Sequence, residues 1–455
     1  MINMLPPEWS QDLESHIHDL VQKSQRKLVV LDDDPTGTQT VYDIPVFTMW
    51  TVDVLAKALR DSSYVGFFIL TNSRTMTAEG ATKLNQEIAA NLRAASRQTG
   101  VPVDVISRSD STLRGHFPLE IDILYDALEG DFDGCLLIPF FAEGGRYTIN
   151  DTHYVAEADR LTPAADTPFA QDRVFGYRSS NLAAWIEEKS GGRIQATEVA
   201  SISIDDIRLG GPDRVVERLM ALSGRTYCVV NAASLSDLHV VVVGLMRAQA
   251  QGKCFLFRTA ASFVQARLGL TRRPLLDAEA IADPAVLGGG LILVGSYVPK
   301  TTAQLRHVVQ YCAVEHIELD VIKLLNDPLA VVDEVTPRVN AALHTGDDIV
   351  VYTSRDLIAV DDAARNLAIG STVSQSLISI VQAVAHRPRY ILAKGGYHIQ
   401  RHRYPRGLNV ERALVSWDRF CQAFRSGGWA RRVGFQIYDT LSSPGMWAKF
   451  IHLLM

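Results

Sequence analysis

The stretch that decides the fold reads Lys27-Leu28-Val29-Val30-Leu31-Asp32-Asp33-Asp34-Pro35-Thr36-Gly37. Its first five residues form a short and mostly apolar run, and a run of this kind is typical of a strand that is buried on both faces. Three carboxylates follow at once, and then Pro and Gly break the pattern. The stretch therefore predicts a buried strand with a strongly acidic loop at its carboxyl end.

Nine more short apolar runs follow along the chain. The segments between them carry apolar residues at helical spacing, as in residues 54–59, 78–97 and 299–311. Strands that alternate with helices indicate mostly parallel sheets covered by helices on both faces. The fold class is therefore predicted to be α/β. The ten predicted strands are residues 27–31, 67–71, 103–107, 135–139, 227–231, 254–258, 291–296, 317–322, 349–354 and 390–394.

Length and composition narrow the class of protein. The 455 residues are 47% apolar and 21% charged, which indicates globular domains rather than a disordered or fibrous chain. A formal net charge of −6 gives no basic footprint for nucleic acid. The five cysteines are scattered, and the N-terminus has no signal-peptide pattern, so we expect a cytoplasmic location. No apolar run approaches the roughly 20 residues that a membrane span needs.

A domain boundary is predicted between residues 270 and 290. Thr271-Arg-Arg-Pro, an Ala-Asp-Pro and three consecutive glycines interrupt the pattern there, and a new strand begins at Leu291. We therefore expect one domain over residues 1–275 and a second over residues 276–455.

The loop after the first predicted strand is the first candidate site. Adjacent carboxylates repel one another, so Asp32, Asp33 and Asp34 need cationic or hydroxyl partners. One interpretation is an acidic turn whose geometry is set by Pro and Gly. The other is a loop that binds a polyol or faces a metal, with one Asp acting as a general base.

Two further strand ends carry similar chemistry. Residues 107–116 read Ser-Arg-Ser-Asp-Ser-Thr-Leu-Arg-Gly-His, and residues 143–150 read Glu-Gly-Gly-Arg-Tyr-Thr-Ile-Asn. Arginines of this kind bind carboxylates bidentately, and hydroxyls pair with vicinal hydroxyls. Ser111 or Thr112 could instead cap a following helix. Because ligands of open α/β sheets bind at the carboxyl ends of strands, the three loops together predict an anion-binding pocket for a small hydroxy acid.

The second domain opens with Val294-Gly295-Ser296 and continues to Thr302 and Gln304. A Gly-Ser turn that leads into a helix N-terminus favours phosphate, although an ordinary strand-to-helix turn has the same appearance. No Walker loop and no GxGxxG pattern occurs in the sequence.

Taken together, these motifs resemble the four-carbon acid sugar kinase family, which was formerly grouped as a domain of unknown function. The similar pieces are Asp33-Asp34-Pro-Thr36-Gly37, Asp110-Ser-Thr-Leu-Arg114-Gly115, Glu143-Gly-Gly-Arg146-Tyr147-Thr148 and Val294-Gly295-Ser296 with Thr302 and Gln304. The resemblance implies a sugar-acid domain followed by a nucleotide domain, with the ligand cleft between them. It also implies transfer of the ATP γ-phosphate to the terminal hydroxyl of threonate, erythronate or 3-oxo-tetronate.

Site residues follow from the resemblance position by position. Asp110 is the first choice as the catalytic base and Asp34 is the other. ATP and Mg²⁺ are expected, with Mg²⁺ held largely by phosphates and water and no protein metal site. The expected partners are a small-molecule sugar acid and ATP, with neither nucleic acid nor a membrane, and a homo-oligomer is left open. The sugar-acid side would be lined by Asp33, Asp34, Thr36, Gly37, Arg108, Asp110, Ser111, Arg114, Gly115, Arg146 and Tyr147, and the nucleotide side by Gly295, Ser296, Thr302, Ser354, Gly395 and Gly396.

The resemblance breaks after Gly396. The family continues with Gly-Gly-x-Thr-Ser and closes with a Pro-Gly-Asn-Val-Gly turn, whereas here Gly396 is followed by Tyr-His-Ile-Gln-Arg-His-Arg-Tyr. Residues 397–455 carry nine Lys or Arg against three Asp or Glu, a balance of +6, while the remainder carries −12. This tail also holds three of the six tryptophans.

A shift of reading frame accounts for the break. Residues 397–404 can be encoded so that the next frame reads Ile-Thr-Ser-Ser-Asp-Ile-Ala-Thr, which is similar to the family. Residues 406–415 are family-like as they stand, and from Ser416 onward the other frame permits a Pro-Gly-Asn-Val-Gly turn. We therefore expect a frameshifted C-terminus and an impaired kinase. The alternatives are an authentic divergent tail and a catalytically inactive relic that binds only a sugar acid.

Overall fold

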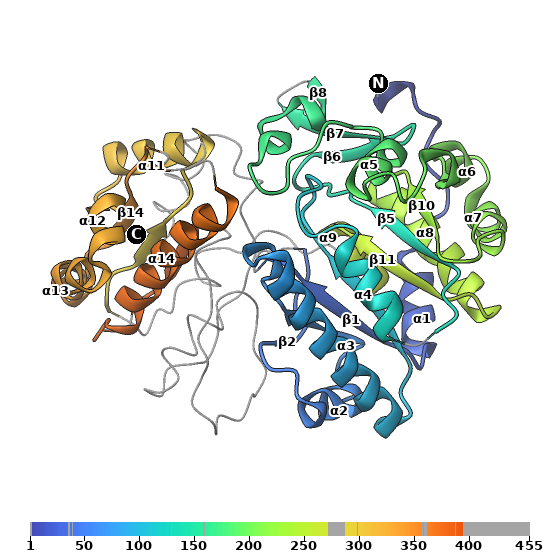
Figure 1. Cartoon of the computed structure of the whole chain (residues 1–455), viewed down its shortest axis with the longest axis horizontal. Helices are drawn as coiled ribbons and strands as arrows, with labels where there is room; N and C mark the ends of the chain where they lie inside the picture. Colours follow the sequence, from blue (N-terminus) through green and yellow to red (C-terminus); the bar gives the residue numbers. More distant parts are fainter. Residues whose placement is uncertain are drawn as a thin grey trace. The chain divides into compact units, whose positions relative to one another are not determined.

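The computed structural model of the protein describes residues 2–34, 37–38, 40–128, 130–157, 160–271, 287–297, 299–356, 358, 362–386 and 388–394. The chain divides into two compact units, Met1–Arg273 and Pro274–Met455. Each unit contains its own parallel sheet. The expectation of mostly parallel sheets with helices in two domains is therefore confirmed (Figure 1).

The N-terminal unit is built on eight strands in the order β2-β3-β1-β4-β11-β5-β10-β9, and each neighbouring pair is parallel. All six strands predicted in this unit are present within a residue or two of their predicted ends. The short strands β2 and β9 lie at the two edges and were not predicted. The strands are β1 (Lys27–Asp32), β2 (Val46–Phe47), β3 (Gly66–Leu70), β4 (Val103–Arg108), β5 (Gly134–Ile138), β9 (Ala200–Ile202), β10 (Thr226–Val230) and β11 (Phe255–Thr259).

Helices cover both faces of this sheet, because successive residues of a strand point to opposite sides. Val29 and Leu31 pack with α2, α3, α4 and α5, while Leu28 and Val30 pack with α1, α6, α7, α8 and α9. The bounds are α1 (Glu14–Lys23), α2 (Val52–Arg60), α3 (Ala78–Thr99), α4 (Leu119–Ala127), α5 (Leu182–Lys189), α6 (Ile204–Arg208), α7 (Gly211–Met220), α8 (Leu235–Ala250) and α9 (Ala261–Arg267).

An antiparallel insertion follows β5 and was not predicted. It consists of the ribbon β6 (Arg146–Ile149), β7 (Thr152–Glu157) and β8 (Arg160–Pro163), followed by the 3-10 helices η3 (Ala164–Asp166) and η4 (Pro168–Gln171). Its first strand begins at one of the predicted site loops. Three further 3-10 helices are η1 (Ile2–Met4), η2 (Ser73–Thr75) and η5 (Ala196–Glu198).

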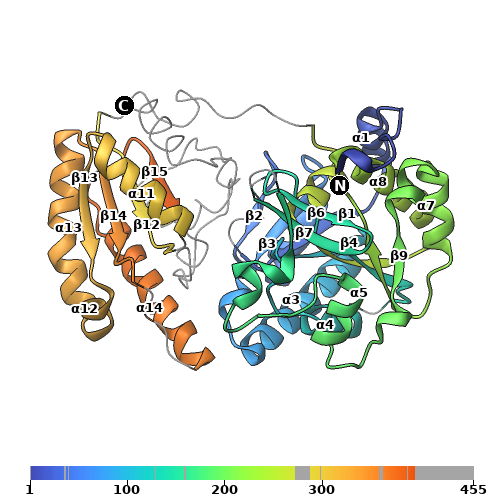
Figure 2. The ribbon, with the colours of Figure 1, turned by 90° about the horizontal axis from the view of Figure 1, so that it is seen from above.

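The C-terminal unit has four parallel strands in the order β13-β14-β12-β15. One face packs against α12, α13 and α14 and the other against α11, so that α13 and α11 lie on opposite sides of the strands (Figure 2). The bounds are β12 (Leu291–Val294), α11 (Pro299–Tyr311), β13 (Glu315–Leu319), α12 (Val321–Asn326), α13 (Pro328–Thr345), β14 (Ile349–Thr353), α14 (Ala363–Gln382) and β15 (Ile391–Lys394).

One predicted strand extends too far. The expectation of strand over residues 317–322 is wrong at its end, because β13 stops at Leu319 and α12 begins at Val321. The reason is Asp320, whose side chain accepts hydrogen bonds from the backbone N–H groups of Ile322 and Lys323. An aspartate in this position satisfies the first donors of a helix, so it starts α12 within the apolar run.

Candidate functional site

The three carboxylates that follow β1 lie in three different environments. Asp32 Oδ1 accepts a hydrogen bond from Arg108 Nη1 at 3.3 Å, and Asp34 forms an ion pair with Arg74. Neither oxygen of Asp33 accepts a hydrogen bond, and Arg108 Nη1 lies 3.8 Å from Asp33 Oδ1. Only 2% of Asp33 is exposed. Asp33 is therefore a buried carboxylate with unused acceptor capacity.

Burial also affects the protonation of this loop. It raises the pKa of Asp32 to about 7, although the nearby Arg108 guanidinium opposes the shift. It raises the pKa of Asp33 as well, against the attraction of Arg74 and Arg108. Burying a carboxylate without hydrogen bonds destabilises the folded protein. A ligand that donated hydrogen bonds to Asp33 would therefore stabilise it.

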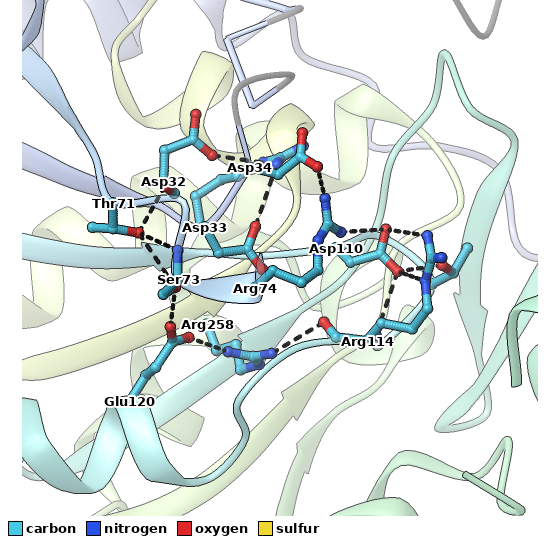
Figure 3. Close-up of polar contacts among 12 residues, drawn as sticks. Asp32, Asp33, Asp34, Thr71, Ser73, Arg74, Asp110, Arg114, Glu120 and Arg258 are labelled. Carbon is cyan, nitrogen blue, oxygen red and sulfur yellow. Dashed lines mark hydrogen bonds and ion pairs between the residues drawn. The ribbon is translucent and has the colours of Figure 1, made fainter. Parts of the chain in front are cut away.

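The carboxylate of Asp110, which follows β4, is hydrogen-bonded and ion-paired to other side chains of the protein. Arg114 donates to it from Nε at 2.7 Å and from Nη2 at 3.2 Å, and Arg74 Nη1 lies 3.2 Å from Oδ1. Thr112 also donates its hydroxyl to this carboxylate. Burial alone would raise the pKa of Asp110, but Arg114 and Arg74 together hold it well below its usual range. Figure 3 shows Arg74 and Arg114 converging on Asp110. Such a carboxylate is a weak base.

Helix capping does not explain the hydroxyls of this loop. The next helix, α4, begins at Leu119, and its N-cap residue is Pro118. Neither Ser111 nor Thr112 therefore caps it. Ser111 is buried, and its carbonyl oxygen accepts a hydrogen bond from His153.

Arg114 and Arg146 approach the same aromatic ring. Their guanidinium carbons lie 5.2 Å and 5.3 Å from the centre of Phe169 in η4. Arg114 has carboxylate partners in Asp110 and Asp172. Arg146 is only 9% exposed, and within the described ranges it forms no ion pair; it donates to the carbonyl of Gly144, and its Nε has no partner. A buried guanidinium of this kind favours an anionic ligand.

Arg258 on β11 lies at the centre of the site, and the sequence analysis missed it. It is 2% exposed and pairs with Glu120 at 3.2 Å, and Glu120 in turn accepts a hydrogen bond from Ser73 (Figure 3). Gly115 packs between this arginine and Asp33. A Cβ there would lie 3.0 Å from Arg258 Nη2 and 3.1 Å from Asp33 Oδ2, and the φ of +122° also favours glycine.

Gly37 has a related role beside the first carboxylate. A side chain at this position would collide with the carboxylate of Asp32. The glycine of the acidic loop therefore allows the backbone to approach the end of β1. Thr36, the neighbouring predicted residue, lies outside the described residues.

Polar atoms without partners gather at the carboxyl ends of four adjacent strands. They belong to Asn72 after β3, Asp33 after β1, the Nε of Arg108 on β4 and the hydroxyl of Thr259 on β11. Each of these residues is at least 97% buried. Buried polar groups are nearly always hydrogen-bonded, so four unpaired groups at one sheet edge indicate a ligand site.

Tyr147 does not join this group. Along β6 it alternates with Arg146, so the two side chains point to opposite faces of the ribbon. The Tyr147 ring packs edge-on against Phe140 and contributes to the apolar core. Its position indicates a structural role.

In the C-terminal unit, Gly295 and Ser296 follow β12, and Arg355 reaches them from the end of the adjacent strand β14. Arg355 donates to the Ser296 carbonyl at 2.8 Å, and Thr353 donates to the Gly295 carbonyl at 3.3 Å. The turn is therefore held by Arg355, which the predicted site did not include.

The other described residues that were predicted to bind nucleotide form hydrogen bonds with neighbours other than Gly295 and Ser296. Thr302 lies in the first turn of α11 and donates to the Tyr297 carbonyl at 3.4 Å. Ser354 follows β14, and its hydroxyl accepts from the backbone N–H of Val321 at 3.3 Å. Gly395 and Gly396 lie outside the described residues, as does the altered tail over residues 397–455.

Among the described residues, no three His, Cys, Asp or Glu side chains are grouped in a way that could hold a metal ion. In the same part of the chain, no helix has the length and apolar character needed to cross a membrane.

Comparison with family models gives two matches. A model described as a sugar-binding N-terminal domain matches residues 28–267, and one described as a nucleotide-binding C-terminal domain matches residues 291–415. The first match alone spans more than half of the chain. The second begins at the first strand of the C-terminal unit and ends at residue 415, so it includes residues 397–404.

Solved structures also resemble this chain. A Salmonella typhimurium LT2 protein described as a candidate tRNA synthase has 16% sequence identity and a TM-score of 0.56, with 82% of this chain and 86% of that chain covered. A Haemophilus influenzae protein assigned to a domain of unknown function has 20% identity and a TM-score of 0.46, with 77% and 82% covered. A Bordetella bronchiseptica protein of the same domain, solved with citrate as a domain-swapped dimer, has 20% identity and a TM-score of 0.41, with 82% and 84% covered. No curated protein matches the sequence.

Proposed function

The chain belongs to the family whose members join a sugar-binding N-terminal domain to a nucleotide-binding C-terminal domain, and we propose that it is by descent an ATP-dependent kinase of four-carbon sugar acids. The reaction would transfer the γ-phosphate of ATP to the terminal hydroxyl of threonate, erythronate or 3-oxo-tetronate. The membership itself supports sugar and nucleotide binding. The acid substrate and the transfer are our proposal.

The unpaired polar groups at the carboxyl edge of the N-terminal sheet carry this proposal. Asp33 accepts hydrogen bonds, Arg108 Nε donates them, and Asn72 and Thr259 do both. A polyol matches such a mixed set, because each hydroxyl is both a donor and an acceptor. Arg146 adds a buried cation that has no carboxylate partner among the described residues, which suits the acid group. A small polyhydroxy acid fits both features.

Among the acidic residues considered, Asp33 fits the role of general base best. The base must accept the proton of the reacting hydroxyl, so it needs a free oxygen and a suitable pKa. Asp34 is paired with Arg74, and Asp110 is held ionised by Arg114 and Arg74. Asp33 has two oxygens without hydrogen bonds and a pKa raised by burial. We therefore assign the base to Asp33 in place of Asp110 or Asp34, and leave those two to hold the arginines.

The C-terminal unit would bind ATP. Gly295 and Ser296 follow β12, and Arg355 places a guanidinium beside them, which suits phosphate oxygens. Mg²⁺ would arrive with the nucleotide and neutralise charge on the phosphates. Because the chain's own residues act mainly by positioning and by charge, the loss of donors at this end should reduce turnover strongly.

The departure of the tail favours a second candidate, a relic that binds the sugar acid only. The family's Thr-Ser after Gly396 and its closing Asn-Val-Gly turn are absent from this sequence. The nucleotide-domain match ends at residue 415, which supports the proposed second frame break. The groups that support sugar-acid binding all lie in the N-terminal unit and precede the break.

Two measurements test the function. A coupled ADP-release assay with threonate, erythronate and 3-oxo-tetronate is run on the chain as it stands and on a version with the frame restored over residues 397–404 and from 416 onward. We expect turnover near background for the first and an ordinary kinase rate of about 1–100 per second for the second. Isothermal titration should show that both versions bind a tetronate and that only the restored one binds ATP.

Ordinary turnover by the chain as it stands would contradict the impairment. Tetronate binding without ATP binding in both versions would favour the relic. No tetronate binding in either version would refute the sugar-acid site. The coding DNA around codons 396–397, 405 and 416 would show directly whether the reading frame changes.

A further inference from the structure

The antiparallel insertion, taken together with residues 172–177 that follow η4, contacts the loop that connects β4 to α4 at four points. His153 Nε2 lies 2.8 Å from the carbonyl oxygen of Ser111, and the hydroxyl of Tyr177 donates to the carbonyl of Thr112 at 2.8 Å. Asp172 lies 3.7 Å from Arg114 Nη1, and the Phe169 ring lies under the same guanidinium. His153 and Tyr177 thus hold the backbone of this loop, and Asp172 and Phe169 hold its arginine. The part of the loop that they contact is residues 110–115.

The loop needs such support because its backbone is unusual. Leu113 has a φ of +71°, in the left-handed region that side chains other than Gly, Asn and Asp rarely adopt. Gly115 follows with a φ of +122°. Residues in sparsely populated conformations persist only where the surrounding structure fixes them, so the loop would relax if its external contacts were removed.

His153 is the most deeply buried of these contacts. It is 0% exposed, and its Nδ1 lies 3.0 Å from the hydroxyl of Thr148 on β6. A carbonyl oxygen only accepts, so Nε2 carries the proton toward Ser111 and Nδ1 accepts from Thr148. Burial lowers the pKa of this imidazole to about 4, which is consistent with the neutral form. The ring therefore links the ribbon to the loop through one defined tautomer.

We propose that the insertion is a clamp on the 110–115 loop and that His153 is a positioning residue, which acts through the Ser111 carbonyl to hold Arg114 beside Arg146 on the Phe169 ring, where the substrate's acid group would bind. The binding part of this inference rests on the proposed function. The geometric part does not, because the clamp and the loop are both present without a ligand.

The test uses the full chain and three substitutions. His153→Leu removes the donor, His153→Gln keeps an amide N–H at a similar reach, and His239→Leu is a matched control on α8. Hydrogen exchange of a peptide spanning residues 109–117, followed by mass spectrometry without ligand, should become about tenfold faster in His153→Leu, because a buried carbonyl loses its partner. His153→Gln should restore most of the protection, and His239→Leu should leave it unchanged.

The binding arm measures the Kd of threonate, erythronate and 3-oxo-tetronate by titration. His153→Leu should raise the Kd about tenfold in the native background but less than twofold with Arg114→Ala, because neighbouring residues that act as one unit are not additive. Equal effects in both backgrounds, or faster exchange with an unchanged Kd, would overturn the positioning role. Unchanged exchange would overturn the clamp. If the native chain binds none of the three acids, the proposed function fails, and the exchange result still decides the clamp.

Discussion

Charged residues are paired differently at the two ends of the strands in the N-terminal sheet. We call the amino-terminal ends of these strands the amino edge and their carboxyl-terminal ends the carboxyl edge. At the amino edge, Asp104 receives Arg26 at 2.6 Å and Arg267 at 2.7 Å, and Asp133 receives Lys253 at 2.7 Å. At the carboxyl edge, the Asp33 carboxylate accepts no hydrogen bond, and Arg146 has no carboxylate partner in the described part of the chain. The acidic residues of the amino edge are therefore paired within the protein, while the carboxyl edge leaves a buried carboxylate and a buried guanidinium with unused hydrogen-bonding capacity.

This difference predicts which substitutions affect the stability of the fold and which affect ligand binding. A buried charge that is paired within the protein supports the fold, because removal of one partner strands the other. A buried charge that lacks a partner lowers stability until a ligand arrives. Substitutions at the amino edge should therefore mainly affect unfolding, and substitutions at the carboxyl edge should mainly affect binding and turnover.

The largest effect is expected at Asp33. In the frame-restored protein, Asp33→Asn should lower kcat by about 10²- to 10⁴-fold, the usual contribution of a general base. The free energy of unfolding, measured with urea, should stay the same or increase, because the buried carboxylate accepts no hydrogen bond and its contact with Arg108 is long, at 3.8 Å. A variant that lost stability but kept its kcat would place Asp33 among the structural carboxylates instead.

The matching substitution at the amino edge should show the reverse. Asp104→Asn leaves Arg267 buried without its carboxylate and should reduce the free energy of unfolding by about 3–5 kcal/mol. Tetronate affinity of the folded protein should not change. Asp213→Asn is the control, since its partner Arg247 forms only an exposed pair, and its effect should stay within about 0.5 kcal/mol.

Arg146 tests the acid group of the substrate. Arg146→Gln should weaken tetronate binding by about 1.5–3 kcal/mol, the range for a hydrogen bond to a charged group. Urea unfolding should show no loss of stability, because no ion pair is broken. The expectation fails if titration gives the native affinity, which would leave Arg146 outside the pocket.

Asp32 provides the most specific effect, a change in the pH dependence of the free energy of unfolding. Its folded pKa of about 7 exceeds its ordinary value of 3.8, so between these pH values the native state holds a proton that the unfolded state releases. This carboxyl therefore makes the free energy of unfolding fall with rising pH by about 1.4 kcal/mol per unit. Asp32→Asn should remove that slope in urea titrations between pH 4.5 and 6.5. If the free energy of unfolding depended on pH in the same way in both proteins, Asp32 would have an ordinary pKa.

Much of the fold could be predicted because buried parallel strands have a simple signature. Ten apolar runs became ten strands, including the run that begins at Lys27. The antiparallel ribbon was missed because its half-exposed strands, such as β8, carry polar residues and no apolar run. The strands β2 and β9 were missed because two or three residues are too few for any period to be recognised.

The candidate site could be predicted only in part. Asp33 and Arg114 follow predicted strands and lie at the expected edge. Asn72 and Arg74 follow the second predicted strand in the same way, so the strand-end rule could have found them had it been applied there. Arg258 is the last residue of the predicted strand 254–258, so it too stood at a strand end. It was missed because the position of β11 between β4 and β5 depends on a strand order that the sequence does not reveal.

The central place of β11 also has a consequence for biosynthesis. The strand lies between β4 and β5, yet the ribosome makes it about 120 residues after β5, so the middle of the sheet stays open until Thr259 has left the exit tunnel. Domains generally fold as units during synthesis, the N-terminal one first. Truncation between Val230 and Phe255 would thus leave a nascent chain with two half-sheets and exposed strand edges. A reading error after Gly396, by contrast, would occur when the whole of the N-terminal sheet has already been synthesised.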